Sequence, residues 1–391
     1  MQADTEGFLR PVINQDVCVE CGMCIKICPI NTPTAKSDIP LHVYSGWSKD
    51  DDVRKYSASG GAFAELALYF MEKMKGVVFG VAMNEKVEAC HIMINHKNDI
   101  RELQGSKYVQ SNIGDAYKQA EIMLTQGKKV LFSGTPCQIA GLRNYLKHDY
   151  ENLYTADLIC HGVPSGKVFA DYIKYIEQHI GHVVYDVRFR CKKNSWLFFN
   201  MAINSHVEKN GAITYEYEGG YYSDPYIRAF LRDNALRPSC YQCQFTSVNR
   251  VSDFTFADWW GYKAETVEDK DFEKKGVSLI FCNSQKASQA IKELNMCLRE
   301  RTLDEAKKTN MSLSKPFPRP VTRDEFWEDY SKMSFKEITK KWLSPEKLMP
   351  DQYTRYRCSN LYVRRFMEKL SRGYMKICRK LGKAVVKIEA K

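Results

Sequence analysis

The spacing of apolar residues along the first half of the chain alternates between helical and strand periods. From Ala62 to Met74, apolar side chains recur at three- and four-residue intervals, which predicts an amphipathic helix after the small-residue loop Ser57–Gly61. Short apolar runs without this period predict strands. The further predicted elements are strands at 77–83 and 90–94, a helix at 113–125, a strand at 129–132, a helix at 137–146 and a strand at 153–159.

The middle of the chain predicts a parallel unit followed by antiparallel strands. The strand, helix and strand of residues 129–159 form the kind of unit that brings two parallel strands together. Ser165 is placed to cap a helix that ends near Ile180. We therefore expect an α+β (mixed α/β) fold with a parallel strand-helix-strand core and an antiparallel portion. Later elements are predicted as strands at 185–189, 198–203 and 213–217, a helix at 224–232, and strands at 254–259 and 278–281.

Length and composition allow more than one domain. The chain has 391 residues, 44% of them hydrophobic, which suffices for a full core in two or three domains. No apolar stretch approaches the roughly 18–20 residues that cross a bilayer, and Met1–Gly7 lacks a signal-peptide pattern, so we expect a cytoplasmic protein. The predicted divisions are a cysteine-rich segment at 1–35, a main domain at 36–340 with parts at about 40–125 and 126–340, and a basic helical tail at 341–391.

The net charge of +11 is concentrated at the C-terminal end of the sequence. Residues 352–391 hold twelve Lys and Arg against two Glu, a net of +10, so the rest of the chain is nearly neutral. Apolar residues follow a helical stripe through this tail, which indicates a docked terminal helix with a solvated basic face. Contact with an acidic protein partner or a peripheral contact with an anionic membrane surface are the alternatives. We do not expect nucleic acid as a partner.

The strongest chemical motif is a run of closely spaced cysteines. Cys18, Cys21, Cys24 and Cys28, followed by Pro29, match the spacing with which bacterial ferredoxins bind a 4Fe-4S cluster. Structural zinc sites, the main alternative, usually take their ligands from two separated pairs. In two-cluster ferredoxins the fourth cysteine of such a run binds the other cluster, and this sequence has one run. The fourth ligand is therefore Cys28, another cysteine, or a residue outside this chain.

A second set of cysteines is spread over the main domain. If the strands before Cys137 and Cys160 are parallel, both residues emerge at the carboxyl edge of one sheet, where α/β proteins build their sites. Together with Cys240 and Cys243 they supply four thiolates, enough for a second 4Fe-4S cluster. The alternatives are a buried strand-end thiol at Cys160 with a zinc site at the Cys240 pair, or a catalytic thiol at Cys137.

The sequence around Cys137 favours an accessible, ionised thiol. Thr135 can cap the helix and Pro136 can be its first residue, which puts Cys137 in the first turn. There the helix dipole favours the thiolate. This location suits a metal ligand or a nucleophile, for which His161 would be a candidate base.

Two loops are candidates for binding a cofactor phosphate or ring. No glycine fingerprint of a Rossmann site follows a strand. The loop containing Ser59, Gly60 and Gly61 opens a helix and offers backbone amides to an anion, although such loops are commonly simple helix starts. The second loop is either an ordinary polar loop or a site for phosphate and isoalloxazine, and its candidate residues are Ser106, Lys107, Tyr108, Gln110 and Ser111. The strand at Asp253–Gly261 is mostly explained by packing, and Asp258 at its end is a candidate polar contact.

The order and spacing of these motifs resemble a known family. The motifs are Ser59–Phe63, Gly105–Ser111, Gly134–Gln138, Cys160–Gly162, the Cys240 pair and Asp253–Gly261, and they cover about residues 15 to 285. Together they resemble the coenzyme F420 hydrogenase/dehydrogenase beta subunit family, while the tail beyond about Pro345 lies outside the resemblance. Longer relatives have two ferredoxin-type runs, of which this chain has one.

The resemblance implies FAD, a 4Fe-4S cluster in the main domain and a ferredoxin-like N-terminal segment. It places the flavin contacts on the Ser59 loop and on Lys107 to Ser111, and the cluster ligands on the later four cysteines. The implied function is an FAD-dependent oxidoreductase that exchanges electrons with a ferredoxin-like or catalytic redox partner and hydride with a deazaflavin or another small organic substrate. Bacterial relatives also occur in surface-polysaccharide pathways. A non-catalytic electron-transfer subunit and a zinc-bound binding module are the alternative functions.

Overall fold

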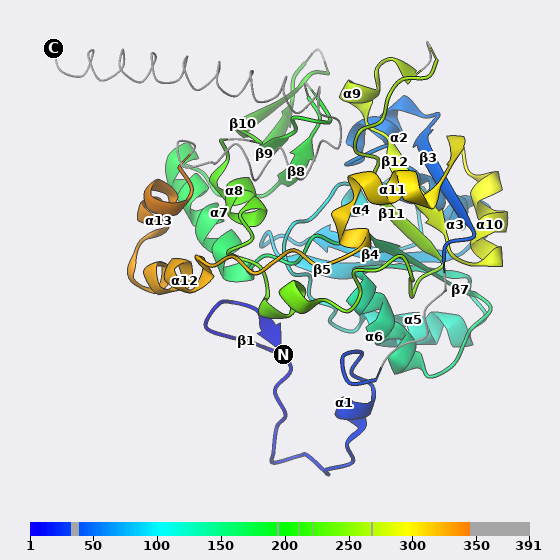
Figure 1. The fold of residues 1–391 in the computed structure, drawn as a ribbon, viewed down its shortest axis with the longest axis horizontal. Helices are drawn as coiled ribbons and strands as arrows, with labels where there is room; N and C mark the ends of the chain where they lie inside the picture. Colours follow the sequence, from blue (N-terminus) through cyan, green and yellow to red (C-terminus); the bar gives the residue numbers. More distant parts are fainter. Residues whose placement is uncertain (33–38, 194, 210, 222, 267–268, 345–391) are drawn as a thin grey trace.

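A mixed eight-stranded sheet forms the centre of the molecule (Figure 1). The computed structural model describes residues 1–32, 39–193, 195–209, 211–221, 223–266 and 269–344. Four strands at the middle of the sheet, β4, β6, β7 and β11, run parallel, and antiparallel strands flank them on both sides. In spatial order the strands are β13 (Met296–Arg301), β3 (His42–Ser48), β12 (Ser278–Cys282), β11 (Phe254–Asp258), β7 (Leu153–Leu158), β6 (Val130–Ser133), β4 (Val77–Met83) and β5 (Ala89–Ile94).

Helices cover both faces of this sheet because its central strands are apolar on both sides. Alternate residues of β6 face opposite layers: Leu131 packs with α3 and α10, whereas Val130 and Phe132 pack with α5 and α6. The sheet is therefore buried between two helical layers. The covering helices are α3 (Ala62–Glu72) and α10 (Gln285–Ala290) on one face, and α5 (Ala116–Thr125) and α6 (Pro136–Leu146) on the other.

A second, smaller sheet has its own core. Strands β8 (Val187–Cys191), β9 (Asn200–Val207) and β10 (Ile213–Gly220) pair antiparallel, and α7 packs on them through Phe169, Tyr172 and Ile176. Two late helices complete this core with Phe326 and Ile338. The helices of this part are α7 (Gly166–Ile180), α8 (Pro225–Leu231), α12 (Arg323–Lys332) and α13 (Phe335–Trp342).

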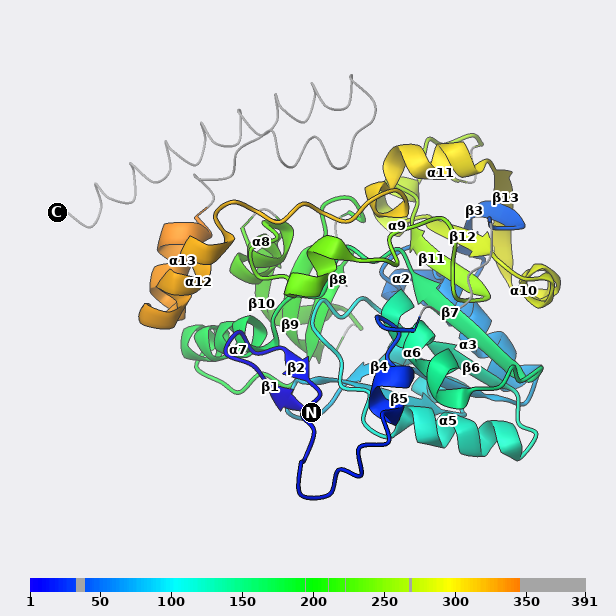
Figure 2. The same ribbon diagram turned by 60° about the horizontal axis from the view of Figure 1, so that its bottom comes forward.

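Short elements connect these layers and form the N-terminal segment. A small hairpin joins β1 (Gln2–Ala3) to β2 (Leu9–Arg10), and α1 (Met23–Lys26) follows beside α6 in both views (Figures 1 and 2). The remaining helical elements are α2 (Asp51–Tyr56), α4 (Ile100–Leu103), α9 (Phe272–Lys275), α11 (Leu303–Thr309), and the 3-10 turns η1 (Lys97–Asp99), η2 (Pro238–Gln242), η4 (Ile291–Glu293) and η5 (Met311–Leu313).

The structure confirms the predicted fold class and most of the predicted elements. The parallel strand, helix and strand at 129–159 and the antiparallel strands after residue 185 are present, with shifts of a few residues at their ends. Ser165 caps α7 as predicted. The basic tail lies outside the described residues from position 345 onward. In the part of the chain that the structure describes, no helix combines the length and apolar character of a membrane span.

Candidate functional site

The site begins where β6 ends and α6 starts. Thr135 has the extended backbone of an N-cap and Pro136 occupies the first turn, as the sequence predicts. The Gln138 side chain accepts a hydrogen bond from the Thr135 amide at 2.9 Å, and the Thr135 hydroxyl lies 3.1 Å from Cys137 Sγ. Cys137 is accessible to solvent. The local sequence therefore fixes this thiol at the carboxyl edge of the parallel strands.

Three distant segments bring four thiols together at this edge. Cys137 starts α6, Cys160 follows β7, and the Cys240 pair lies on and just after η2. Burial, and then the negative charge of the other three thiols, raises the pKa of Cys160 well above its ordinary value. Burial and the neighbouring thiolates likewise raise the pKa of Cys240 to about 11. The raised pKa values favour the neutral thiols, and the positive charge of a metal would be needed to hold all four as thiolates.

Desolvation opposes the effect that the helix dipole is predicted to have on Cys137. Desolvation by the surrounding protein raises the pKa of Cys137, and the neighbouring Cys243 thiol adds to this effect. The hydrogen bond to the Thr135 hydroxyl and the positive charge of Arg237 lower the pKa of Cys137, but their effects are weaker than that of desolvation. The Cys137 side chain reaches the surface, yet the protein groups around it desolvate the thiolate.

A buried arginine ties the cysteine-bearing segments together. The Arg250 guanidinium pairs with Asp157 on β7 at 2.9 Å, and both side chains are at most 1% exposed. Arg250 also donates hydrogen bonds to the carbonyl oxygens of Leu158, just before Cys160, and of Phe245 and Ser247, just after Cys243. The charge of Arg250 thus fixes the end of β7 against the Cys243 loop.

The donor set fits a four-iron cluster. Among the described residues, no three His, Cys, Asp or Glu side chains form a group of the kind that holds a metal ion. A four-iron cube, however, distributes its thiolates over four irons, so its ligands stand farther apart than the ligands of one tetrahedral zinc. Arg237, whose positive charge acts on Cys137 and Cys240, would offset part of the negative charge of such a cluster.

The N-terminal cysteines lie in a segment without a core of its own. Gly22, in the left-handed conformation, precedes α1, and no residue of α1 is buried. Cys21 and Cys24 are exposed, while Cys18 and Cys28 are partly exposed. This arrangement agrees with the expectation that the segment gains its order from a metal cluster or from docking.

The Ser59 loop directs its polar atoms into the sheet. Ser59 Oγ donates to the Val277 carbonyl at 2.7 Å, and the Gly60 amide donates to Ser278 Oγ at 3.0 Å. A Cβ on Gly60 would lie 2.4 Å from the Gly46 carbonyl oxygen, so only glycine fits between β3 and β12. Gly61 adopts the left-handed conformation before α3, with a φ of 98°. These contacts give Ser59 and Gly60 structural roles, and the flavin role predicted for this loop stays a prediction.

The side chains of the loop at 105–111 contact three different parts of the molecule. Lys107 donates to the carbonyls of Glu102 and Gln104 at the end of α4, at 2.8 and 2.9 Å, and burial lowers its pKa to about 7. Gln110 accepts a hydrogen bond from the Leu9 amide of the N-terminal hairpin at 2.9 Å. Ser111 accepts one from the Gln138 side chain at 2.9 Å, next to Cys137. Ser106 is partly exposed. The loop therefore touches the N-terminal segment and the later cysteine set.

Arg190 is a candidate functional residue that the sequence did not indicate. Its Nη1 pairs with Asp258 at 2.5 Å, and the Tyr108 hydroxyl lies close enough to interact with its charge. Arg190 is 7% exposed, and its Nε and Nη2 have no hydrogen-bond partner among the described residues. Free buried donors of this kind suit an anionic or carbonyl-bearing ligand. The available signal was the alternation of Arg188, Arg190 and Lys192, which continues past the predicted end of the strand at residue 189.

A row of aromatic rings connects the two halves of the site. His161, next to Cys160, has its ring centroid 4.8 Å from that of Phe230. Phe230 in turn stacks on Tyr108 at 4.7 Å with an interplanar angle of 19°. His161 Nε2 lies 2.5 Å from Asp233 Oδ1, so its ring is also held by a carboxylate. The rings form a continuous packed path from the later cysteines to Arg190.

Comparison with known proteins gives matches over most of the chain. Residues 43–118 and 127–306 match the models of the N-terminal and C-terminal parts of the coenzyme F420 hydrogenase/dehydrogenase beta subunit, and residues 11–34 match a 4Fe-4S binding domain. A structure of the xenon-derivatised F420-reducing NiFe hydrogenase complex from Methanosarcina barkeri aligns with a TM-score of 0.47 and 15% identity, covering 77% of this chain and 95% of that one. No curated protein matched the chain.

Proposed function

The chain belongs to the coenzyme F420 hydrogenase/dehydrogenase beta subunit family, an oxidoreductase family, and carries a 4Fe-4S binding motif; we propose that it is an iron-sulfur flavoprotein. In this proposal it binds FAD and two 4Fe-4S clusters, and it connects a ferredoxin-like or catalytic redox partner with a deazaflavin or another small organic substrate. When bound, FAD supplies hydride chemistry and the clusters supply single-electron transfer.

The convergence of the four later thiols is the observation that carries the proposal. Cys137, Cys160, Cys240 and Cys243 come from three segments, yet their charges act on one another. The positive charge of Arg237 acts on Cys137 and Cys240. Four converging thiols with a cation beside them suit a cluster whose thiolate ligands make it anionic.

The flavin is proposed to lie beside Arg190 and Tyr108. Arg190 keeps two donor atoms without a hydrogen-bond partner among the described residues. Lys192, just after β8, holds the neighbouring Ser59 loop in place, because its ammonium donates to the carbonyls of Arg54, Ser59 and Lys275 at 2.6–2.7 Å. A pyrophosphate or a ring carbonyl would satisfy the Arg190 donors. Tyr108 is held by Phe230 and by Tyr226, whose hydroxyl donates to the Tyr108 carbonyl at 2.5 Å. These residues would orient the ring rather than react with substrate.

The row of aromatic rings from His161 through Phe230 to Tyr108 would lie between the proposed cluster and the proposed flavin. His161 and Phe230 connect Cys160 to Tyr108 through contacting rings. Asp233 fixes His161 at 2.5 Å, and Phe317 stacks on the same ring with centroids 3.8 Å apart. A tightly packed path keeps the proposed donor and acceptor at a constant separation.

Anaerobic purification with metal, sulfide and flavin analysis tests the proposal. We expect about eight irons and eight acid-labile sulfides per chain, a flavin absorption band, and release of FAD on denaturation. A matched variant, Arg190→Leu, should lose flavin while it keeps its iron, because Arg190 does not contact the cysteine set. Zinc in place of iron, or iron with no flavin under all conditions, would refute the assignment.

Reduction assays distinguish an enzyme from a non-catalytic subunit. If bound flavin is reduced by a soluble deazaflavin or another small organic donor, the chain performs the substrate chemistry itself. Reduction only in the presence of a separate protein would instead support the electron-transfer subunit. The cofactor content is the same in both cases, so this assay is independent of the first.

A further inference from the structure

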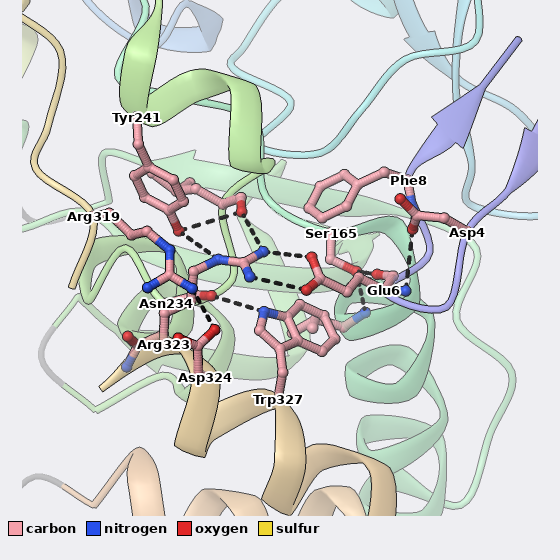
Figure 3. A network of polar contacts seen from close by, with 12 residues as sticks. Asp4, Glu6, Phe8, Ser165, Asn234, Tyr241, Arg319, Arg323, Asp324 and Trp327 are labelled. Atoms are coloured by element: carbon pink, nitrogen blue, oxygen red, sulfur yellow. Dashed lines mark hydrogen bonds and ion pairs between the residues drawn. The ribbon is translucent and has the colours of Figure 1, made fainter. Parts of the chain in front are cut away.

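The N-terminal hairpin is docked firmly on the main body (Figure 3). Phe8 at its tip is fully buried, and Ser165 Oγ, at the start of α7, donates to the Glu6 carbonyl. Gly7 has a φ of 82°, and a Cβ at this position would lie 2.4 Å from Lys167 Cβ. The hairpin backbone therefore rests directly on the first turn of α7, with no room for another side chain.

Arg323 links this hairpin to the later cysteine set. Its guanidinium forms a two-pronged pair with the Glu6 carboxylate, with Nη1 to Oε1 at 2.9 Å. The same guanidinium donates from Nε to the Tyr241 hydroxyl at 3.2 Å. Tyr241 is the residue directly after Cys240, and it is buried. Figure 3 shows Arg323 between Glu6 and Tyr241, so one buried cation holds both segments.

A second attachment lies on the other side of the cysteine run. The Gln244 side chain, next to Cys243, donates to the Pro29 carbonyl, next to Cys28, at 2.8 Å. Three residues later, the Thr32 carbonyl accepts a hydrogen bond at 3.0 Å from Asn144 on α6, the helix that begins with Cys137. The chain before the run and the chain after it are thus both fastened to the elements that carry the second cysteine set.

Resting on the proposed function, these contacts point to a direct connection between the two cluster sites. We propose that Arg323 and Gln244 are positioning residues that hold the Cys18–Cys28 run against the Cys240–Cys243 loop, so that electrons pass directly between the two sites. In each transfer one electron leaves one site and enters the other, with no bond or proton moved. Gln244 joins the two cysteine loops directly, and Arg323 anchors the hairpin from which the run starts.

The magnetic interaction between the two reduced clusters tests the role of Gln244. In the full-length, fully reduced wild-type protein we expect a split or broadened paramagnetic resonance signal, because two spins at close range interact. Gln244→Ala should lose this splitting while its iron content equals that of wild type. Gln242→Ala is the matched control, since this glutamine is also exposed and lies two residues before Gln244, at the end of η2.

Limited trypsin digestion tests Arg323 without relying on a cluster. Arg323→Met should increase the cleavage rate after Lys26 several-fold, as measured by mass spectrometry, because the hairpin no longer fixes the run. Arg319→Met is the matched control: Arg319 pairs with Asp324 at the surface, with side chains 43% and 79% exposed. The resonance experiment on Arg323→Met should show the same loss of splitting as Gln244→Ala.

The outcomes separate this inference from the proposed function. Two full clusters with an unchanged splitting in both Gln244→Ala and Arg323→Met would overturn the positioning role and leave the proposed function standing. A wild-type protein with iron for one cluster or none would overturn both. Loss of splitting in the two variants, with both controls like wild type, supports the inference.

Discussion

Replacement of Arg250 is the sharpest test of how the later cysteine set is assembled. Arg250→Met removes the guanidinium that joins β7 to the loop after Cys243 and keeps an apolar side chain of similar length. The Asp157 carboxylate, whose side chain has no exposed surface, then loses its cation. Asp157 Oδ2 has no hydrogen-bond partner among the described residues. The negative charge of this carboxylate therefore depends strongly on the Arg250 guanidinium for its stabilisation.

The expected loss of stability is large because a buried charge is left unpaired. Removing one partner of a buried ion pair costs about 3–5 kcal/mol, which corresponds to a fall in Tm of about 5–8 °C for a domain of this size. Arg319→Met breaks an exposed pair and should cost about 0–1 kcal/mol. We also expect iron at the later site to fall, while the N-terminal iron remains.

Thermal unfolding of the apo proteins, together with iron analysis, measures both effects. The double variant Asp157→Asn/Arg250→Met should recover about half of the lost stability, since no unpaired charge remains. It should not recover the iron, because the link between β7 and the Cys243 loop is still missing. An Arg250→Met protein as stable as Arg319→Met, with full iron, would refute this account of Arg250.

Three further results are expected. Cys240→Ala and Cys18→Ala should each lose about half of the iron, because the proposed function assigns each residue to a separate cluster; full iron in either variant contradicts the assignment. Phe230→Leu should slow electron exchange between flavin and cluster several-fold at unchanged cofactor content, as followed by rapid-mixing absorption, and an unchanged rate would rule out the ring path. Burial raises the pKa of Asp224 from 3.8 to about 6, so its protonation stabilises the folded state as the pH falls. Relative to Asp224→Asn, wild-type apo protein should therefore gain about 1 kcal/mol of unfolding free energy between pH 7 and pH 5, and a difference independent of pH would contradict this.

Much of the fold and of the cysteine chemistry could be predicted from local patterns. The 77–83 strand and the cap at Thr135 follow from spacing and residue type, and both occur as predicted. The strands β3 and β13 and the last two helices were not predicted. β3 is buried on both faces and contains Gly46, so its pattern lacks the alternation of a half-buried strand. Its place in the sheet depends on pairing with β12 and β13, which follow more than 200 residues later.

The candidate flavin contacts show the limit of reasoning from motifs. Ser59 and Gly60 have the residue types of an anion loop, yet their polar atoms bond to β12. Lys107 has the charge of a phosphate ligand, yet it caps α4. Arg190 has two donor atoms without a hydrogen-bond partner among the described residues. No local motif marks it as a site residue, because Asp258 and Tyr108 come beside it only in the folded protein.

By itself the sequence determined the chemistry available to this protein: the ferredoxin-type run, the later thiols and the carboxyl-edge location of Cys137, because spacing and local caps act over a few residues. The tertiary structure decided which groups meet. The attachment of Glu6 to Arg323 spans 317 residues and that of Pro29 to Gln244 spans 215. Neither partner has a local pattern that indicates the other, because such contacts arise only when the folded sheet and helices bring their surfaces together.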